Sequence, residues 1–303
     1  MRLDRFCAAR HPERSRSQLA RLIREGLVLL DGAAARPSVP LSPGSVVTVT
    51  LPPPADERVH PAPLPLDVLY EDEHFLVINK PAGLVVHPGA GVRGPTLAAA
   101  LLHRDARLAG VGGAGRCGLV HRLDRGTSVL LLVARHPAAH EKLAAQFRAR
   151  RVDKLYHAIV WGRPGEAAGS IELPVGRDPR SRVKMSTRSA RARRAESHYR
   201  VLEEVPGFAL VAVKIVTGRT HQVRVHLSAL GHPIVGDRTY AGDRTRSVLD
   251  PLKRKALRTL DRPALHARKL RFEHPATGAS MSFIAPWPEQ LTLVWRALGG
   301  AAP

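Results

Sequence analysis

The chain has 303 residues, 44% of them hydrophobic, and its 47 lysines and arginines outnumber 26 aspartates and glutamates to give a formal net charge of +21. The length allows a substantial core divided between two domains, and the charge favours a polyanionic partner, either nucleic acid or an anionic membrane. Of the 47 basic residues, 39 are arginines, which bind phosphate through two nitrogens and stack on bases, so nucleic acid is the better candidate. A GC-rich genome would raise the arginine count, but it would not explain the net excess.

Several other classes of protein are disfavoured. The two cysteines, Cys7 and Cys117, are far apart and suggest neither a disulfide framework nor a cysteine zinc site. The first residues, MRLDRFCAARHPER, lack the apolar segment of a signal peptide, and no apolar run approaches the length of a membrane span. We therefore expect a cytoplasmic protein without membrane contact.

Residues 15–26, SRSQLARLIREG, predict the first helix. Ser15 with Gln18 fits a capping box at its start, and Gly26 fits its C-terminal stop. The apolar face is formed by Leu19, Leu22 and Ile23. Three arginines lie away from that face, namely Arg16, Arg21 and Arg24. They form either an ordinary solvated surface or an RNA-binding one, and the shortage of acids favours RNA.

Strands are predicted next at residues 27–30 and 46–51, with a turn at Asp31 and Gly32 after the first. The segments RLDRF, SRSQLARLIREGLVLLDG and PLSPGSVVTVTLP together resemble an S4 RNA-binding module, and the likeness covers almost the whole unit. We therefore expect an S4-like domain over residues 1–52. PPPADERVHPAPLP, residues 52–65, contains six prolines and predicts a stiff extended linker.

The linker is assigned to residues 53–66, the larger domain to 67–298 and a frayed tail to 299–303. In the larger domain the predicted strands outnumber the helices and do not alternate regularly with them. The fold class is therefore α+β, with a mixed, mainly antiparallel sheet flanked by helices. Strands are expected at residues 67–70, 75–79, 129–133, 155–161, 199–203 and 209–216, and helices at 96–102 and 138–148.

The stretch GLVHRLDRGTSVLLLVAR, residues 118–135, places a polar cluster immediately before a buried strand, where loops commonly carry function. Its aspartate, Asp124, lies beside two arginines, Arg122 and Arg125. A structural role is open to it, as a cap on a turn or as the ion-pair partner of either arginine. Composition alone favours that structural role.

Two further segments favour a functional role for Asp124 over a structural one. TGRTHQVRVHLSALGHPIVGD, residues 217–237, predicts a loop entering a helix, with Thr220 as N-cap and Gly231 as the stop. The buried stripe is expected to consist of Val223, Leu227 and Leu230. On the flank of that stripe, the guanidinium of Arg224 would need a carboxylate or a phosphate. KLYHAIVWG, residues 154–162, places Tyr156 early in a strand.

The sequence does not contain the motifs of several other enzyme classes. H-E-x-x-H is absent, and His221 and His226 are five residues apart, so they do not share a helix face. His87 and His121 complete no recognisable ligand set, so we expect neither a metal nor a cofactor. No G-x-S-x-G, P-loop or G-x-G-x-x-G sequence is present, which leaves nucleotide hydrolysis and hydride transfer without support.

The segments NKPAGLVVHPG, HRLDRGTS, K-x-Y-x-A-x-V-x-G, TGRTHQVRVH and GHPIVGD follow one another in an order that resembles the RluA family of pseudouridine synthases. The likeness runs from about Pro65 to Pro288. Within the family, the S4 module, the HPGAG sequence and DRPALHARKLRFEHP are similar to the D-type enzymes of large-subunit rRNA. One position departs from the family pattern: Val129 replaces a glycine, at a place where a Cβ can shift the preceding loop.

The resemblance implies isomerisation of uridine to pseudouridine, which breaks and remakes a bond between ribose and base without net hydrolysis or redox chemistry. It makes Asp124 the nucleophile, Arg224 the residue that keeps it ionised, and Tyr156 the ring that stacks on a flipped-out base and assists proton removal. Further substrate or RNA contacts are expected from Arg122, His121, Arg125, Thr127, Lys154, Arg219, His221 and Gln222, and from Arg16, Arg21 and Arg24 of the first helix.

Residues 177–194 carry eight basic residues and one acid, among them Arg182 and Lys184. They form either a solvated loop or, as we favour, a segment that becomes ordered on RNA. The predicted function is therefore an isomerase acting as a monomer on large-subunit (23S) rRNA, free or in pre-ribosomal particles. The same chemistry on tRNA, and a non-catalytic assembly factor on this scaffold, are the alternatives; a hydrolase or metalloenzyme lacks its ligand set.

Overall fold

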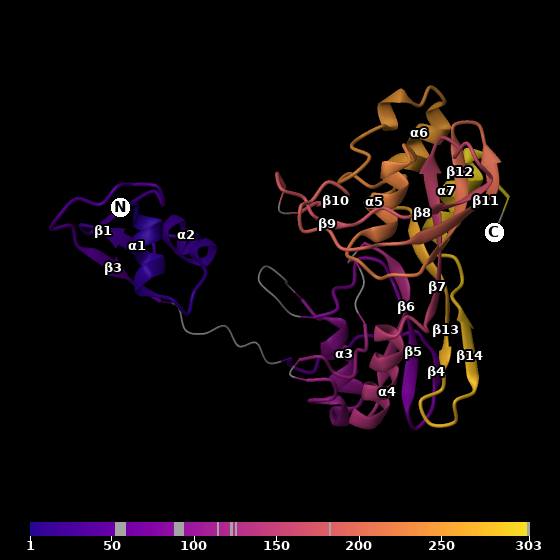
Figure 1. Ribbon diagram of the computed structural model, residues 1–303, viewed down its shortest axis with the longest axis horizontal. Coiled ribbons are helices and arrows are strands. Elements are labelled where there is room, and N and C mark those ends of the chain that lie inside the picture. The colour runs from indigo at the N-terminus through magenta and orange to yellow at the C-terminus, as the bar shows by residue number, and fades with distance from the viewer. Residues whose placement is uncertain are drawn as a thin grey trace. The chain divides into compact units, whose positions relative to one another are not determined.

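The computed structural model describes residues 1–51, 59–87, 94–113, 115–121, 124, 126–181 and 183–301. The chain divides into two compact units, Met1–Asp56 and Glu57–Pro303 (Figure 1). The first part of the predicted proline-rich linker, residues 52–58, lies outside the described residues. No helix in the described ranges is both long enough and apolar enough to cross a membrane.

The first unit packs two helices against a small sheet of strand order β2-β1-β3. The capping box predicted at Ser15 and Gln18 is present, and Gly26 follows the helix in a left-handed conformation, as expected. The helix that precedes Ser15 in the chain was not predicted, and neither was the short strand that follows Asp31 and Gly32. The elements are α1 (Leu3–Arg10), α2 (Arg16–Arg24), β1 (Val28–Leu30), β2 (Ala33–Ala34) and β3 (Val47–Val49). Their core contains Leu3, Cys7, Leu19, Leu22, Ile23 and Val28.

The second unit contains a nine-stranded mixed sheet, which confirms the predicted fold class. Its main path runs β4-β5-β6-β13-β7-β12-β11-β8, and β14 pairs with β13. Among the described strands only β6 and β13 pair in parallel, so the sheet is mainly antiparallel. The strands are β4 (Val68–Glu71), β5 (Phe75–Lys80), β6 (Ser128–Ala134), β7 (Asp153–Trp161), β8 (Ala168–Ile171), β11 (Ser197–Val205), β12 (Phe208–Ile215), β13 (Leu265–Glu273) and β14 (Ser280–Ile284).

Helices cover the sheet on both faces (Figure 1). Alternate residues of β6 show this, because Leu131 joins a core with α3, α5 and α7, whereas Leu130 and Leu132 join a second core with α4. All seven residues of β6 are buried, as expected of a central strand. The helices are α3 (Leu97–Arg104), α4 (Pro137–Arg148), α5 (Gln222–Ala229), α6 (Pro251–Arg258) and α7 (Glu289–Leu298), with short 3-10 turns at Ala106–Leu108 and Thr245–Ser247.

The basic segment predicted to become ordered on RNA already contains a small two-stranded sheet in the protein alone. Its strands are β9 (Gly176–Arg177) and β10 (Met185–Ser186), which pair antiparallel. We refer to residues 176–186 as the β9–β10 hairpin. Arg182, within it, lies outside the described residues.

Val129, which replaces the glycine of the family pattern, forms regular strand pairs. It lies opposite Lys80 of β5 and Ala267 of β13, and its side chain is buried in the larger core. The valine therefore fits at the start of β6 without a break in the ladder.

The loop that leads into β6 is tethered to the strand that follows it. The Ala134 N–H donates to the Gly118 carbonyl at 2.8 Å, and the Val120 N–H donates to the Leu132 carbonyl at 3.3 Å. Residues 118–120 thus run antiparallel to the end of β6. Gly118 has a φ of +77°, and a Cβ at this position would overlap the carbonyl oxygen of Ala134.

Gly118→Ala should therefore destabilise the second unit more than Gly110→Ala does. Gly110 also has a positive φ, +81°, but no atom lies within 4 Å of the Cβ it lacks. We expect Gly110→Ala to cost about 1–2 kcal/mol of unfolding free energy for the left-handed backbone alone. Gly118→Ala should add about 1–3 kcal/mol for the forced contact.

Urea unfolding followed by tryptophan fluorescence tests this comparison. All three tryptophans, Trp161, Trp287 and Trp295, belong to the second unit, so the signal reports on that unit alone. Equal losses in the two variants would show that the loop is not held as closely to β6 as described.

Candidate active site

The ends of several elements enclose a cavity of about 310 Å³ in the second unit. The loop before β6, the first residues of β7 and the segment between β12 and α5 supply most of its wall. α4 and β13 contribute one side chain each. The lining residues are His121, Asp124, Thr127, Phe147, Lys154, Tyr156, Ile215, Gly218, Arg219, Thr220, His221, Gln222, Val223, Arg224 and Leu265.

A buried guanidinium joins two carboxylates at this cavity. The Nε and Nη2 atoms of Arg224 donate to the two carboxylate oxygens of Asp237 at 2.7 and 2.9 Å. Its Nη1 atom donates to Oδ2 of Asp124 at 3.3 Å. Arg224 is 7% exposed and Asp237 is 1% exposed, whereas the side chain of Asp124 is 25% exposed. Asp237 therefore fixes the guanidinium, and the guanidinium presents its remaining nitrogen to Asp124.

Burial lowers the pKa of Arg224, but the hydrogen bonds and charge of Asp237, together with the charge of Asp124, outweigh it and raise the pKa overall. Arg224 therefore stays a cation. The sequence placed it on the flank of a helix, but it lies inside. The stripe is also corrected: Leu230 is 36% exposed, and Val225 is buried together with Val223 and Leu227.

Tyr156 lies on β7, at the centre of the sheet. Its backbone is paired with Val213 of β12 on one side and with Ala267 of β13 on the other, and the residue is 4% exposed. Burial, and then the charge of Asp124, raise the pKa of the Tyr156 phenol above its ordinary value. The side chain is therefore a neutral phenol at neutral pH.

A second wall of the cavity combines aromatic rings with a lysine. His121 stacks on Phe147 with ring centres 4.6 Å apart, and the Leu132 N–H donates to its Nε2 atom at 3.2 Å. Burial, together with the charge of Lys154, lowers the pKa of His121 to about 3, so the ring is neutral. The Lys154 ammonium lies 5.6 Å from the centre of the Phe147 ring, and burial lowers its pKa.

The loop before α5 is fixed by Gln222. Its Oε1 atom accepts from the Thr217 hydroxyl and the Arg219 N–H, and its Nε2 atom donates to the Glu196 carbonyl and the Ser197 hydroxyl. These bonds occupy the whole amide, so its role in this structure is to position the loop. The predicted N-cap, Thr220, is wrong, because His221 holds that position in a left-handed conformation.

Positive charge gathers beside this loop. Arg219 donates to the Arg194 carbonyl at 3.2 Å, and after burial the charges of Arg193 and Arg150 lower its pKa further. Lys184, in the β9–β10 hairpin, is exposed. Arg122 and Arg125 lie outside the described residues, as does Arg182.

The remaining predicted residues differ in their surroundings. Thr127 is buried and its N–H donates to the Asp124 carbonyl at 3.1 Å, which closes the turn around the aspartate. In the first unit, Arg16 donates twice to the buried carboxylate of Asp4, so it holds α1 to α2. Arg21 pairs with Glu25, and Arg24 is exposed.

The sequence analysis missed three residues of the site. Asp237 lies in the segment GHPIVGD, but no role was predicted for it. Phe147 was expected only as part of the helix at residues 138–148. Tyr240 was not considered, although its ring centre lies 5.0 Å from the Arg224 guanidinium. Among the residues that the structure describes, no group of three or more His, Cys, Asp or Glu side chains is placed to hold a metal ion.

Comparison with known proteins decides the family. Residues 74–229 match the family model for RNA pseudouridylate synthases, and residues 1–47 match that for the S4 domain. The chain belongs to the RNA pseudouridylate synthase family. It is therefore an RNA-modifying isomerase, and its substrate is RNA.

Two relatives of this synthase illustrate how far the similarity extends. Ribosomal large subunit pseudouridine synthase D of Pseudomonas aeruginosa is 44% identical over 95% of this chain and 89% of its own. An uncharacterized RNA pseudouridine synthase of Chloroflexus aurantiacus is 47% identical over 98% of this chain and 90% of its own. Both alignments include the N-terminal unit, since each covers nearly the whole chain.

A solved structure agrees with the fold. Human RNA pseudouridylate synthase domain containing 4 superposes with a TM-score of 0.60 at 29% identity, over 77% of this chain and 92% of its own. The synthase fold is thus shared across most of the second unit.

The two carboxylates of the site should differ in what they contribute to stability. Asp237→Asn places an amide NH₂ against the donors of a buried guanidinium, so we expect a loss of about 3–5 kcal/mol. Asp124→Asn removes one longer contact from a side chain that is partly exposed, and should change stability by less than about 1 kcal/mol. Urea unfolding monitored by tryptophan fluorescence measures both.

A larger loss for Asp124→Asn than for Asp237→Asn would contradict this order of dependence. In that case Asp124, and not Asp237, would be the partner that holds the guanidinium.

Proposed function

We propose that this synthase isomerises a flipped-out uridine of large-subunit rRNA, with Asp124 as the nucleophile. The observation that carries the proposal is the Asp124–Arg224 pair at the wall of the cavity. A carboxylate suits the reaction because it can attack a carbon atom and leave again.

The contacts of Asp124 support this role. Both Arg224 and His221 approach its Oδ2 atom, at 3.3 and 3.6 Å. Its Oδ1 atom makes no hydrogen bond or ion pair with any residue that the structure describes. Arg224 thus holds one oxygen, and the proposal assigns the attack to the other.

The bond changes define what else the site must do. The bond between ribose C1′ and N1 of the base breaks, and a bond between C1′ and C5 forms. The proton on C5 leaves, and N1 gains one. Water must be kept out while the base is detached, because it would hydrolyse the intermediate.

Tyr156 is better suited to stacking on the base while it turns than to removing a proton from it. Its raised pKa leaves it a phenol, so it is a poor base, although its ring can stack on uracil from the floor of the cavity. Ile215, Val223 and Leu265 add apolar surface to the same cavity. Extracting the uridine from its stack costs a few kcal/mol, which such contacts offset.

The class of RNA is inferred from the relatives and from the charge. The curated relatives in Pseudomonas aeruginosa and Xylella fastidiosa are ribosomal large subunit pseudouridine synthases. An S4 domain over residues 1–52, followed by the proline-rich segment 53–66, would provide a separate RNA contact. A ribosomal substrate also fits a cytoplasmic monomer.

Asp124→Asn should abolish pseudouridine formation and leave RNA affinity within about threefold of the parent protein. The amide is close in shape but does not form the bond that the carboxylate forms. Gel-shift binding and single-turnover conversion of an rRNA fragment measure the two properties. Appreciable turnover by the purified variant would refute the assignment.

The substrate itself is identified by mapping pseudouridine in total RNA from cells with and without the gene. Loss of modification in large-subunit rRNA is expected, and loss confined to tRNA would replace the proposed substrate by the alternative one. Complementation with the Asp124→Asn variant is the matched control, since it should bind RNA without restoring the modification.

Arg224 variants test the ion pair. Arg224→Ala should slow the single-turnover step by roughly 100-fold, because the Asp124 carboxylate loses the donor that holds its Oδ2 atom in place. Arg224→Lys should recover only part of the loss, because an ammonium does not reach both carboxylates as a guanidinium does.

Rates are measured where circular dichroism shows each variant folded, because Arg224→Ala also leaves the buried Asp237 without its cation. A variant with normal single-turnover rates and weak RNA binding would identify Arg224 as a phosphate ligand instead.

A further inference from the structure

His221 holds an unusual backbone conformation at the cavity. It is the residue before α5, with φ of +57° and ψ of +17°. Left-handed backbone is uncommon outside glycine, although His, Asn and Asp adopt it more often than other residues. Such strain persists where surrounding contacts enforce it. Here it directs one ring towards both Asp124 and Tyr240.

The hydrogen bonds of Tyr240 fix the proton of that ring. The hydroxyl of Tyr240 accepts from the Met185 N–H at 2.8 Å, and it lies 2.9 Å from Nδ1 of His221. A backbone N–H only donates, and Nδ1 is the one acceptor within hydrogen-bond distance of the hydroxyl among the residues that the structure describes, so the hydroxyl proton is directed to Nδ1. An accepting Nδ1 leaves the ring proton on Nε2. That atom lies 3.6 Å from Oδ2 of Asp124.

The charge states are consistent with this arrangement. Burial lowers the pKa of His221, and the nearby Arg224 lowers it further, although Asp124 and Asp237 act in the opposite direction. Burial raises the pKa of Tyr240, so it keeps its hydroxyl proton. A neutral imidazole and a neutral phenol are the forms that the hydrogen-bond chain needs.

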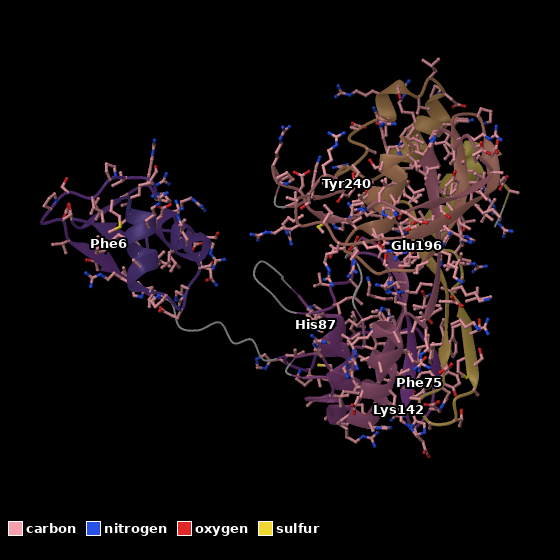
Figure 2. The ribbon with its side chains drawn as sticks, viewed as in Figure 1. Phe6, Phe75, His87, Lys142, Glu196 and Tyr240 are labelled. Atoms are coloured by element: carbon pink, nitrogen blue, oxygen red, sulfur yellow. The ribbon has the colours of Figure 1, made fainter. Side chains whose placement is uncertain are left out.

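We propose that His221 is a positioning residue for the Asp124 carboxylate, and that Tyr240 holds it in the Nε2–H tautomer. The chain runs from the Met185 N–H through the Tyr240 hydroxyl to His221, and ends at Asp124. Figure 2 shows Tyr240 beside the β9–β10 hairpin, which supplies Met185. This inference rests on the proposed function, in which Asp124 is the nucleophile.

The hydrogen-bond chain connects the β9–β10 hairpin directly to the proposed nucleophile. The hairpin carries Arg177, Arg180 and Lys184, and phosphates of bound RNA are expected there. The distance of 3.6 Å exceeds that of a hydrogen bond, and catalytic hydrogen bonds often shorten when substrate binds. RNA bound to the hairpin would thus affect the position of Asp124 through Tyr240 and His221.

The tautomer is measured directly by ¹⁵N NMR of the histidine rings, with His221 assigned from the His221→Asn spectrum. Asparagine tolerates the left-handed backbone, so this variant should remain folded. A pyridine-like Nδ1 and a pyrrole-like Nε2 are expected, with a mixture of tautomers in Tyr240→Phe. Tyr199→Phe is the control, because the Tyr199 hydroxyl makes no hydrogen bond to a described residue. A His221 ring with its proton on Nδ1 would overturn the proposal.

Kinetics test the consequence. Tyr240→Phe and His221→Asn should each lower the single-turnover rate by roughly tenfold, with RNA affinity unchanged within about threefold. Because both act through one chain, the double variant should be no slower than the slower single variant. Losses that multiply, or an unchanged rate in Tyr240→Phe, would overturn the chain.

Met185→Pro tests the link to the hairpin. It removes the N–H that Tyr240 accepts without removing a hydrogen bond between β9 and β10, and Met185→Leu retains that N–H. The proline variant should show the tautomer mixture of Tyr240→Phe, and the leucine variant should not. A single tautomer in both would remove the hairpin from the chain. The NMR result does not depend on turnover, so it separates failure of this chain from failure of Asp124 as the nucleophile.

Discussion

A buried guanidinium that must satisfy two carboxylates is the constraint on which the site depends. Arg224 is removed from water, which is costly unless each of its charged donors finds a partner. Asp237 takes two of the three nitrogens in a parallel, two-pronged contact, which fixes the plane of the guanidinium. The third nitrogen is then aimed at Asp124, 100 residues earlier in the chain. Asp237, which does not line the cavity, thus sets the orientation of the guanidinium that holds the proposed nucleophile.

One segment of the sheet brings the two carboxylate loops together. Arg262 and Pro263 lead into β13 and press on a glycine in each loop. A Cβ at Gly126, after Asp124, would lie 3.3 Å from the ring of Pro263, and a Cβ at Gly236, before Asp237, would overlap the carbonyl of Arg262. Leu265, two residues further on, lines the cavity. The parallel pairing of β13 with β6 then fixes the register of the two strands, and with it the positions at which both loops reach the cavity. Close approach therefore disfavours a side chain at both glycines, and at Gly236 the positive φ of +75° does so as well.

Sequence analysis succeeded where the determining interactions are local, or where several motifs occur in one order. The capping box of α2, the buried strand β6 and the strand that holds Tyr156 depend on nearby residues, and they were predicted. Asp237 received no role, because a buried partner for Arg224 is a tertiary contact that spacing does not reveal. Thr220 was mistaken for an N-cap, since a hydroxyl residue is the usual choice and the left-handed His221 leaves no local signal. β13 was missed because LHARKLRFE interrupts its apolar alternation with basic residues.

The uneven division of Arg224 between its partners explains how one carboxylate can be held and still react. Asp237 makes two short contacts and also accepts from the N–H groups of Thr239 and Tyr240, so its charge is spread over four donors. Such a carboxylate is stable and unreactive. Asp124 receives one contact of 3.3 Å from the same cation, which orients the carboxylate through Oδ2 alone. A nucleophile that must also leave needs this intermediate degree of stabilisation, because tighter pairing would weaken its attack and no pairing would leave it without a fixed orientation.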